Sequence, residues 1–176
     1  MTSKLKLDVL ETGSGSGTIA LNNQLSGMTT ASLPTLTSAE MPSGSVLQVV
    51  SATSTTAVST TSGSLQEYTG CSVTITPSST TSKIIVQMAF NANFQGAPAG
   101  LRSMIYRDST PLGSEAGSYD TNSGNSHADI VRIAYDSPAT TSAVTYKLYF
   151  RSHNGGLVQV YGPWGGVLFL ATEIKG

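Results

Sequence analysis

Alternating glycines near the start of the chain are the first pattern that could do chemistry. Gly13, Gly15 and Gly17 alternate with serine, and glycine-rich loops of this kind can cradle phosphate groups. A phosphate loop ends in Gly-Lys-Ser or Gly-Lys-Thr between a strand and a helix, and neither that ending nor that context follows here. We therefore interpret the segment as a flexible linker.

The histidines and acidic residues do not form a recognisable catalytic set. His127 and His153 lie near Asp129 and Arg151 in a serine-rich sequence, which is the residue set of a Ser/His/Asp hydrolase. No nucleophile-elbow motif surrounds a serine, so strand-end or loop histidines are the favoured interpretation. No pair of acids for glycoside hydrolysis stands out among only ten carboxylates. We expect a non-enzymatic protein with no catalytic residues and no cofactor.

A metal site is also not expected. Oxygen ligands alternate in the segment Asp120-Thr121-Asn122-Ser123-Gly124-Asn125, as in a calcium loop, but the carboxylate that such a loop needs further on is missing. Cys71 is the single cysteine, so it forms no disulfide within the chain, and no Cys/His cluster offers a zinc site. Its place in a strand pattern is typical of a small buried hydrophobic residue.

Aromatic residues in the second half of the chain could form a carbohydrate platform, because sugar rings stack on exposed aromatic rings. Alternation within a strand assigns Tyr146 and Phe150 to the core first. Trp164 lies in a Gly/Pro loop and, with Tyr161, is the best candidate for an interface or ligand anchor. Further candidates for exposed binding loops lie in the segment 113–126: Tyr119, Asp120, Asn122 and Asn125.

Composition favours β-structure with a nearly neutral surface. Only 11% of the 176 residues are charged, whereas 49 are serine or threonine, and the net charge is −1. Threonine suits a pleated sheet, while both hydroxyl residues disfavour helix interiors. The charge balance lacks the basic footprint of a nucleic-acid binder, and no apolar run reaches the length of a membrane span. A weakly charged surface also predicts association with other subunits.

The first 45 residues differ from the rest and predict an extended N-terminal arm. Residues 4–11 alternate charged and apolar types, as in a short half-buried strand, and the glycine-rich linker follows. So little continuous apolar sequence cannot form a core, and we expect the arm to be either mobile in isolation or ordered by docking onto a partner. The apolar residues that would contact this partner are Leu5, Leu7, Val9, Leu10, Ile19 and Leu21.

Residues 46–176 predict a head domain made of strands. In the segment 83–94, Ile84, Val86, Met88 and the following even-numbered residues share one face, which we assign to the core. Residues 101–107 are expected to form its hairpin partner, and the glycine-rich segment 113–126 a long exposed loop. The expected strands cover residues 46–50, 68–75, 83–94, 101–107, 127–135, 144–151, 157–161 and 167–174. Strands at this spacing, without an amphipathic helix, predict an all-β protein, an antiparallel β-sandwich of jelly-roll type.

Three stretches carry a resemblance to a known kind of protein: SKLKLDVLETGSGSGTIALNNQLSGMTTASLPTLTSAEMPSGSVLQVV, then VTITPSSTTSKIIVQMAFN with IYRDSTPLG, and the closing LFLATEIKG. Together they resemble small virion structural and tail-fibre-like proteins of marine bacteriophages, including cyanophages. The resemblance implies location in the virion, a homotrimeric β-sandwich head comparable to tumour-necrosis-factor-like jelly rolls, and an N-terminal segment that attaches the trimer to other virion proteins. The shaft repeats of many fibres are not visible here.

Two roles follow as hypotheses. The first is a short fibre or fibre head that contacts a glycan or protein of the host surface, with the loops 96–100 and 113–126 displayed outward. The second is a cement protein that stabilises capsid or tail without touching the host. An enzyme acting on host glycans is the weakest hypothesis, because the acidic pair is missing.

The arm hypothesis makes a testable prediction. Limited proteolysis should cut residues 1–45 rapidly in the isolated protein and slowly in the assembled particle, because docking orders the arm. Equal cleavage in both states would contradict an anchoring role.

Overall fold

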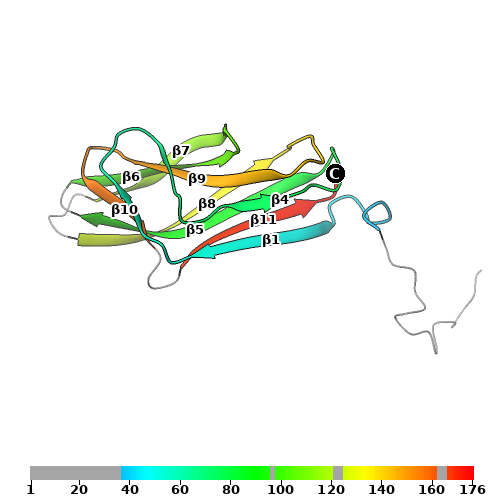
Figure 1. Cartoon of the computed structure of the whole chain (residues 1–176), viewed down its shortest axis with the longest axis horizontal. Helices are drawn as coiled ribbons and strands as arrows, with labels where there is room; N and C mark the ends of the chain where they lie inside the picture. Colours follow the sequence, from blue (N-terminus) through cyan, green and yellow to red (C-terminus); the bar gives the residue numbers. More distant parts are fainter. Residues whose placement is uncertain (1–36, 96–97, 121–124, 162–165) are drawn as a thin grey trace, which may run out of the picture. The chain divides into compact units, whose positions relative to one another are not determined.

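A computed structural model describes residues 37–95, 98–120, 125–161 and 166–176 (Figure 1). The chain divides into two compact units, Met1–Leu36 and Thr37–Gly176, and the described residues all belong to the second. The predicted arm residues Leu5 to Leu21 lie outside them. The described part contains strands and no α-helix, and therefore no helix that could cross a membrane.

Eleven strands are assigned in the described residues. Their bounds are β1 Val46–Ser54, β2 Val58–Thr60, β3 Gln66–Glu67, β4 Val73–Ile75, β5 Lys83–Gln95, β6 Ala99–Arg107, β7 Thr110–Asp120, β8 Asn125–Asp136, β9 Val144–Ser152, β10 Leu157–Tyr161 and β11 Val167–Ile174. All pairings between them are antiparallel.

Two sheets share these strands. In the first, sheet A, β8 pairs with residues 84–95 of β5 along one edge. Along the opposite edge of β5, β11 pairs with residues 83–89 and β10 pairs with residues 91–95. Their outer partners are β2 and β1. In the second, sheet B, β9 lies between β6 and the short strands β3 and β4, and β7 is the edge strand beyond β6.

This pairing is the jelly roll that the sequence predicts. The interrupted strands β1/β2, β3/β4 and β10/β11 can each be counted as one strand, which reduces the eleven strands to eight. In this count the first strand pairs with the eighth, the second with the seventh, the third with the sixth, and the fourth with the fifth. The expected hairpin between residues 83–94 and 101–107 is wrong, because β5 and β6 belong to different sheets. The true hairpin is β6–β7, whose two-residue turn has Asp108 at a φ of 52°.

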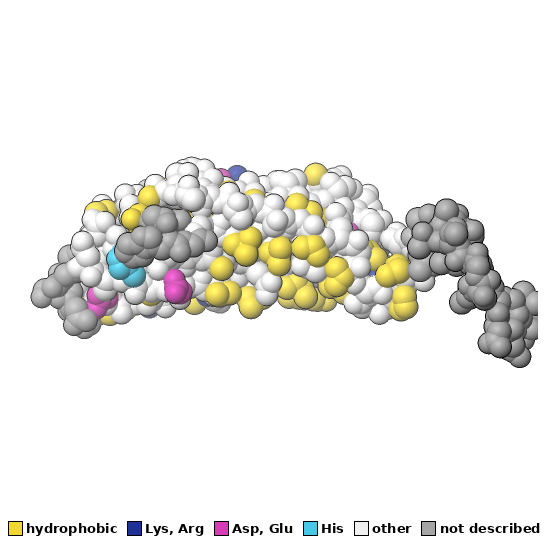
Figure 2. All heavy atoms as spheres, turned by 90° about the horizontal axis from the view of Figure 1, so that it is seen from below, with side chains coloured by type: hydrophobic (Ala, Val, Ile, Leu, Met, Phe, Trp, Pro, Cys, Tyr) yellow, Lys and Arg dark blue, Asp and Glu magenta, His cyan; other side chains and the backbone are white. Residues whose placement is uncertain are grey.

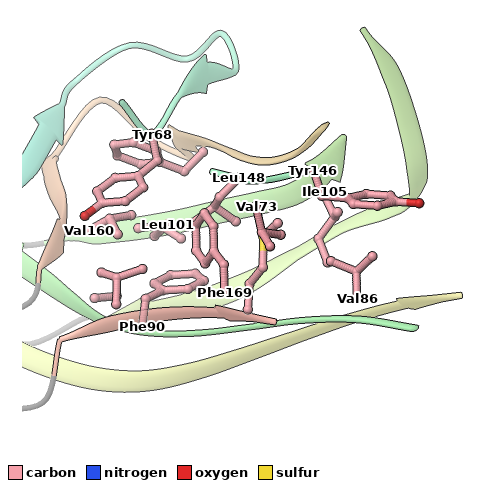
Figure 3. Packing of buried hydrophobic residues seen from close by; sticks show 14 of the residues in the cluster. Tyr68, Val73, Val86, Phe90, Leu101, Ile105, Tyr146, Leu148, Val160 and Phe169 are labelled. Carbon is pink, nitrogen blue, oxygen red and sulfur yellow. The ribbon is translucent and has the colours of Figure 1, made fainter. Parts of the chain in front are cut away.

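The core fills the space between the sheets (Figure 3). From β5 it receives the predicted face, with Ile84, Val86 and Met88 fully buried. The facing sheet B contributes Leu101, Ile105, Tyr146, Leu148 and Phe150. Cys71 packs against this core, and burial raises the pKa of its thiol, which disfavours the reactive thiolate.

The register defines two ends of the head. At the proximal end, β1 and β5 begin and β8 and β11 end. Residues that precede β1 lie here: the Gly44 amide donates to the Lys175 carbonyl at 2.8 Å, and the Lys175 Nζ donates to the Ala39 carbonyl at 2.8 Å. The predicted domain boundary after residue 45 therefore falls inside the unit Thr37–Gly176. At the distal end, β5 and β7 end and β6 and β8 begin.

Two buried carboxylates, Asp136 and Glu173, connect strands through hydrogen bonds at the proximal end. Asp136, 6% exposed, accepts both hydrogen bonds from Arg107 (2.8 and 3.0 Å) and one from the Tyr146 hydroxyl (2.7 Å), which joins the edge of sheet A to sheet B. Burial, followed by this hydrogen bond, raises the pKa of Tyr146. Glu173 is fully buried and accepts from the Ser78 amide and hydroxyl, from the Ser82 hydroxyl and from Gln48 Nε2, at 2.6–2.7 Å.

The segment 113–126 is not the predicted loop. Residues up to Asp120 belong to β7, and β8 begins at Asn125. One of the glycines that indicated a loop, Gly117, has a packing reason: a Cβ there would lie 1.7 Å from the carbonyl oxygen of Leu101 on the neighbouring β6. Glycine in a strand can thus mark a close approach of two backbones rather than a loop.

Glu173 gives a pH-dependent prediction. Burial alone would raise the pKa of its carboxyl, but the hydrogen bonds from Ser82, Gln48 and Ser78 outweigh it and lower the pKa. The carboxylate thus stabilises the fold above its ordinary pKa of 4.5, and this stabilisation is lost as the pH falls through the lowered folded-state pKa. We expect Glu173→Gln to lower the free energy of unfolding by about 2 kcal/mol at pH 7, because its amide would face the amide of Gln48.

Urea unfolding between pH 3 and pH 7 measures the Glu173 effect, and the difference between wild type and variant should shrink toward pH 3. Glu67→Gln is the matched control, because Glu67 lies in a partly exposed pair with Lys147 at 3.1 Å and should change stability little. A Glu173→Gln variant as stable as wild type at pH 7 would contradict the assigned role.

Gly117 gives a second prediction. Gly117→Ala should lower the free energy of unfolding by about 2 kcal/mol, because the new methyl group forces β7 away from β6. Gly63→Ala is the control, since a Cβ there meets nothing within 4 Å, and thermal unfolding of both variants is the measurement. Equal melting temperatures for the two variants would refute the close-approach explanation.

Candidate functional site on the outer face of sheet A

The outward side chains of sheet A form regular rows across its strands. Opposite residues of paired strands share a face, so the residues that alternate with the core positions of β5 line up with outward residues of β8, β11 and β1. From the distal to the proximal side, three rows are Val131–Ala89–Leu168–Thr53, Ile133–Gln87–Leu170–Ser51 and Tyr135–Ile85–Thr172–Val49. We call these rows, with Val46 and Ile174 at their proximal edge, the apolar half of the face.

Large hydrophobic side chains are exposed on this apolar half. Val131, Ile133 and Tyr135 are 61%, 63% and 66% exposed. Of the seven large hydrophobic residues exposed in the described part of the chain, all except Tyr119 lie here. Figure 2, which views the head from below, shows hydrophobic side chains gathered into one patch. A contiguous apolar patch on a protein surface marks an interaction site.

Sheet B shows the opposite pattern on its outer face. Lys147 and Arg151 alternate with buried residues of β9 and therefore point outward. Lys147 pairs with Glu67 at 3.1 Å, and Arg151 pairs with Glu115 at 2.8 Å. Charged side chains thus face solvent from sheet B, whereas sheet A presents apolar ones. The two outer faces of the sandwich are adapted to different surroundings.

Toward the distal end, the face of sheet A becomes polar. Two rows follow the apolar half: Asp129–Asn91–Tyr161 and His127–Asn93–Gln159, which we call the polar half. Asn91 Nδ2 donates to Asp129 Oδ1 at 3.0 Å, and Nδ1 of His127 lies 3.3 Å from Asn91 Oδ1. The rings of His127 and Tyr161 stack with centroids 6.4 Å apart.

A groove lies where the two halves meet. Its cavity volume is about 460 Å³, within the range of small-molecule sites. Asn91, Asp129 and Tyr161 supply its polar and aromatic lining, and Ala89, Val131 and Leu168 supply hydrophobic side chains from the apolar half. Phe90, Ile130 and Gly166 complete the lining.

The predicted binding residues that the structure describes lie at or near the distal end. Tyr161 ends β10 in the groove, whereas Trp164 and Asn122 lie outside the described residues. Tyr119 is 51% exposed, and its ring contacts that of His153 edge-on at a centroid distance of 6.1 Å. Asp120 and Asn125 stand at the facing ends of β7 and β8, where Asp120 accepts a hydrogen bond from Ser126.

Sequence reasoning missed Asn91, Asn93 and Asp129 as a group. Their rows depend on how β5 pairs with β8 and β10, which are 30 or more positions away in the sequence. A signal for the apolar half was present, since β11 is an almost continuous apolar run, as in strands covered on both faces. Among the described residues, no three His, Cys, Asp or Glu side chains converge as metal ligands would.

Comparison with known proteins adds two distant likenesses. No family model and no curated protein matches the sequence. A solved structure of infectious bursal disease virus, Gx strain, shares 14% identity at a TM-score of 0.33, and the match covers 76% of this chain and 38% of the viral chain. A xylan-binding CBM22-1 domain of Paenibacillus barcinonensis Xyn10C shares 11% identity at a TM-score of 0.27, over 77% of this chain and 99% of that domain. Likenesses this weak place no constraint on function, so a function must be argued from the face of sheet A itself.

Proposed function

We propose that this chain is a non-enzymatic structural protein of a bacteriophage virion, a homotrimeric head that its N-terminal arm attaches to the particle and whose distal end contacts the host surface. The observation that carries the proposal is the division of the outer surface: one face of the sandwich is apolar and the opposite face is charged. The resemblance of the sequence to virion proteins of marine phages supports the setting.

The apolar half of sheet A fits a second copy of the same chain. Proximal to the groove lie the rows of Ile133 and Tyr135 and the edge row Ile174–Lys83–Val46. With strands about 4.8 Å apart and rows about 6.8 Å apart, these three rows span on the order of 400 Å² in projection. Protruding side chains make the accessible area larger, toward the roughly 800 Å² per partner of a stable interface. Lys83 is the only charged residue in these three rows, so little charge is desolvated when copies associate.

The two ends of the head fit anchoring and display. The chain enters the head at the proximal end, where residues 37–45 lie against the end of β11. The ends of β5 and β7, the starts of β6 and β8 and the β9–β10 turn lie at the opposite end, on the far side of strands of up to 13 residues. A head anchored by its N-terminal arm would therefore hold this distal end away from the attachment point.

A cement protein is the second candidate, because the apolar face of sheet A could equally cover another capsid or tail protein. Electron microscopy of the intact particle separates the two. Copies at the distal end of a fibre or spike support host contact, whereas a lattice of copies that bridges capsid subunits supports the cement role.

Self-association gives a direct prediction. Light scattering coupled to size-exclusion chromatography should give the full-length protein a mass of three chains. Ile133→Lys should give the mass of a single folded chain, because Ile133 is already exposed in the isolated head and only the interface buries it. Its melting temperature should fall below that of the wild type, because association stabilises the folded state.

The control for this experiment is Met104→Lys on the outer face of sheet B, opposite Tyr149 in the register. It should leave the mass at three chains. A wild-type protein that stays monomeric at micromolar concentration would refute the interface, and a stable dimer would refute the number of subunits.

A further inference from the structure

We infer that the groove between the polar and apolar halves of sheet A is a binding site for a neutral carbohydrate. The inference deepens the proposed host contact, since it names the chemistry of the surface that the head would recognise. It rests on the side chains of β5, β8, β10 and β11 that line the groove.

Planar polar groups on one side of the groove are suited to sugar hydroxyls. Asn91 and Asp129 lie side by side, joined by a 3.0 Å hydrogen bond that holds both groups in place. An amide and a carboxylate together offer donor and acceptor atoms to neighbouring hydroxyls, each of which both donates and accepts. His127, within 3.3 Å of Asn91, extends this polar row along β8 and β5.

Apolar surface on the other side of the groove suits the C–H face of a sugar ring. Val131 and Leu168 contribute exposed aliphatic side chains, and Tyr161 adds an aromatic ring from the row of Asn91. Small-molecule sites combine a mostly apolar lining with a few placed polar groups in this way. Planar polar groups opposite an apolar wall match an amphipathic ligand such as a pyranose.

Charge in the groove selects against anionic ligands. Its described lining contains no lysine or arginine, and Asp129 brings a carboxylate. A phosphate, a sulfated sugar or a sialylated sugar would meet like charge without a compensating cation. The ligand is therefore a neutral glycan rather than an acidic one.

The experiment uses the full-length protein on an array of neutral, sialylated and sulfated oligosaccharides, followed by calorimetric titration of the best ligand. We expect binding to neutral glycans alone. Asn91→Ala and Asp129→Asn should each weaken this binding at least tenfold, with melting temperatures close to wild type because both residues lie on the outer face. The control Glu115→Gln, on sheet B, should bind as wild type does.

Three results would overturn the inference: no glycan bound, preference for acidic glycans, or unchanged affinity in Asn91→Ala. The mass of each variant shows whether a loss of sugar binding comes from the groove itself or from loss of the proposed trimer. Asn91→Ala should remain a trimer, so loss of sugar binding with an intact trimer supports the site. A wild-type protein that forms trimers but binds no glycan would refute the site and leave self-association standing.

Discussion

Strand β5 is the constraint on which the rest of the structure depends. It pairs with β8 along one edge and with β10 and β11 along the other, so it is the centre of sheet A. Its inward residues, from Ile84 to Phe94, fill the core. Its outward residues lie in the middle of every row on the opposite face. A slip of one residue would exchange the two sets, so the same register protects both the fold and the proposed binding face.

The outward residues of β5 also explain why one face has two characters. Ile85 and Ala89 lie in the apolar half, whereas Asn91 and Asn93 lie in the polar half. The apolar half ends where the strand that pairs with β5 changes from β11 to β10. Subunit contact and ligand contact would thus be adjacent on one sheet, and a sugar in the groove would touch Val131 and Leu168 at the border of the proposed interface.

Two buried carboxylates connect the strands at the proximal end. Glu173 gathers Gln48, Ser78 and Ser82 around one buried carboxylate, and Asp136 joins the sheets through Arg107 and Tyr146. Buried charges are tolerated only when hydrogen bonds satisfy them, and both carboxylates meet this condition. The end at which the chain enters the head is therefore held by more than apolar packing, which suits a region proposed to carry the load of attachment.

The sequence by itself determined the class of the fold and most of its strands. Period-two alternation identified β5 and its buried face, and β9 with it, because alternation reflects the geometry of a single strand, whereas an apolar run identified β11. It failed for β7, where Gly117 reflects the approach of a second backbone and not a loop. Tyr161 was found as an isolated aromatic residue, but its partners Asn91 and Asp129 were not.

Only the tertiary structure decided which segments lie next to each other. Local patterns show which residues share a face of one strand, but not which strand pairs with it or whether a sheet carries another layer. Val131, Ile133 and Tyr135 align in the sequence like core residues, yet they point away from the core of this head. They face outward because the register of β8 places them beside Ala89, Gln87 and Ile85 of β5, and that register is set by contacts between residues that are distant in sequence.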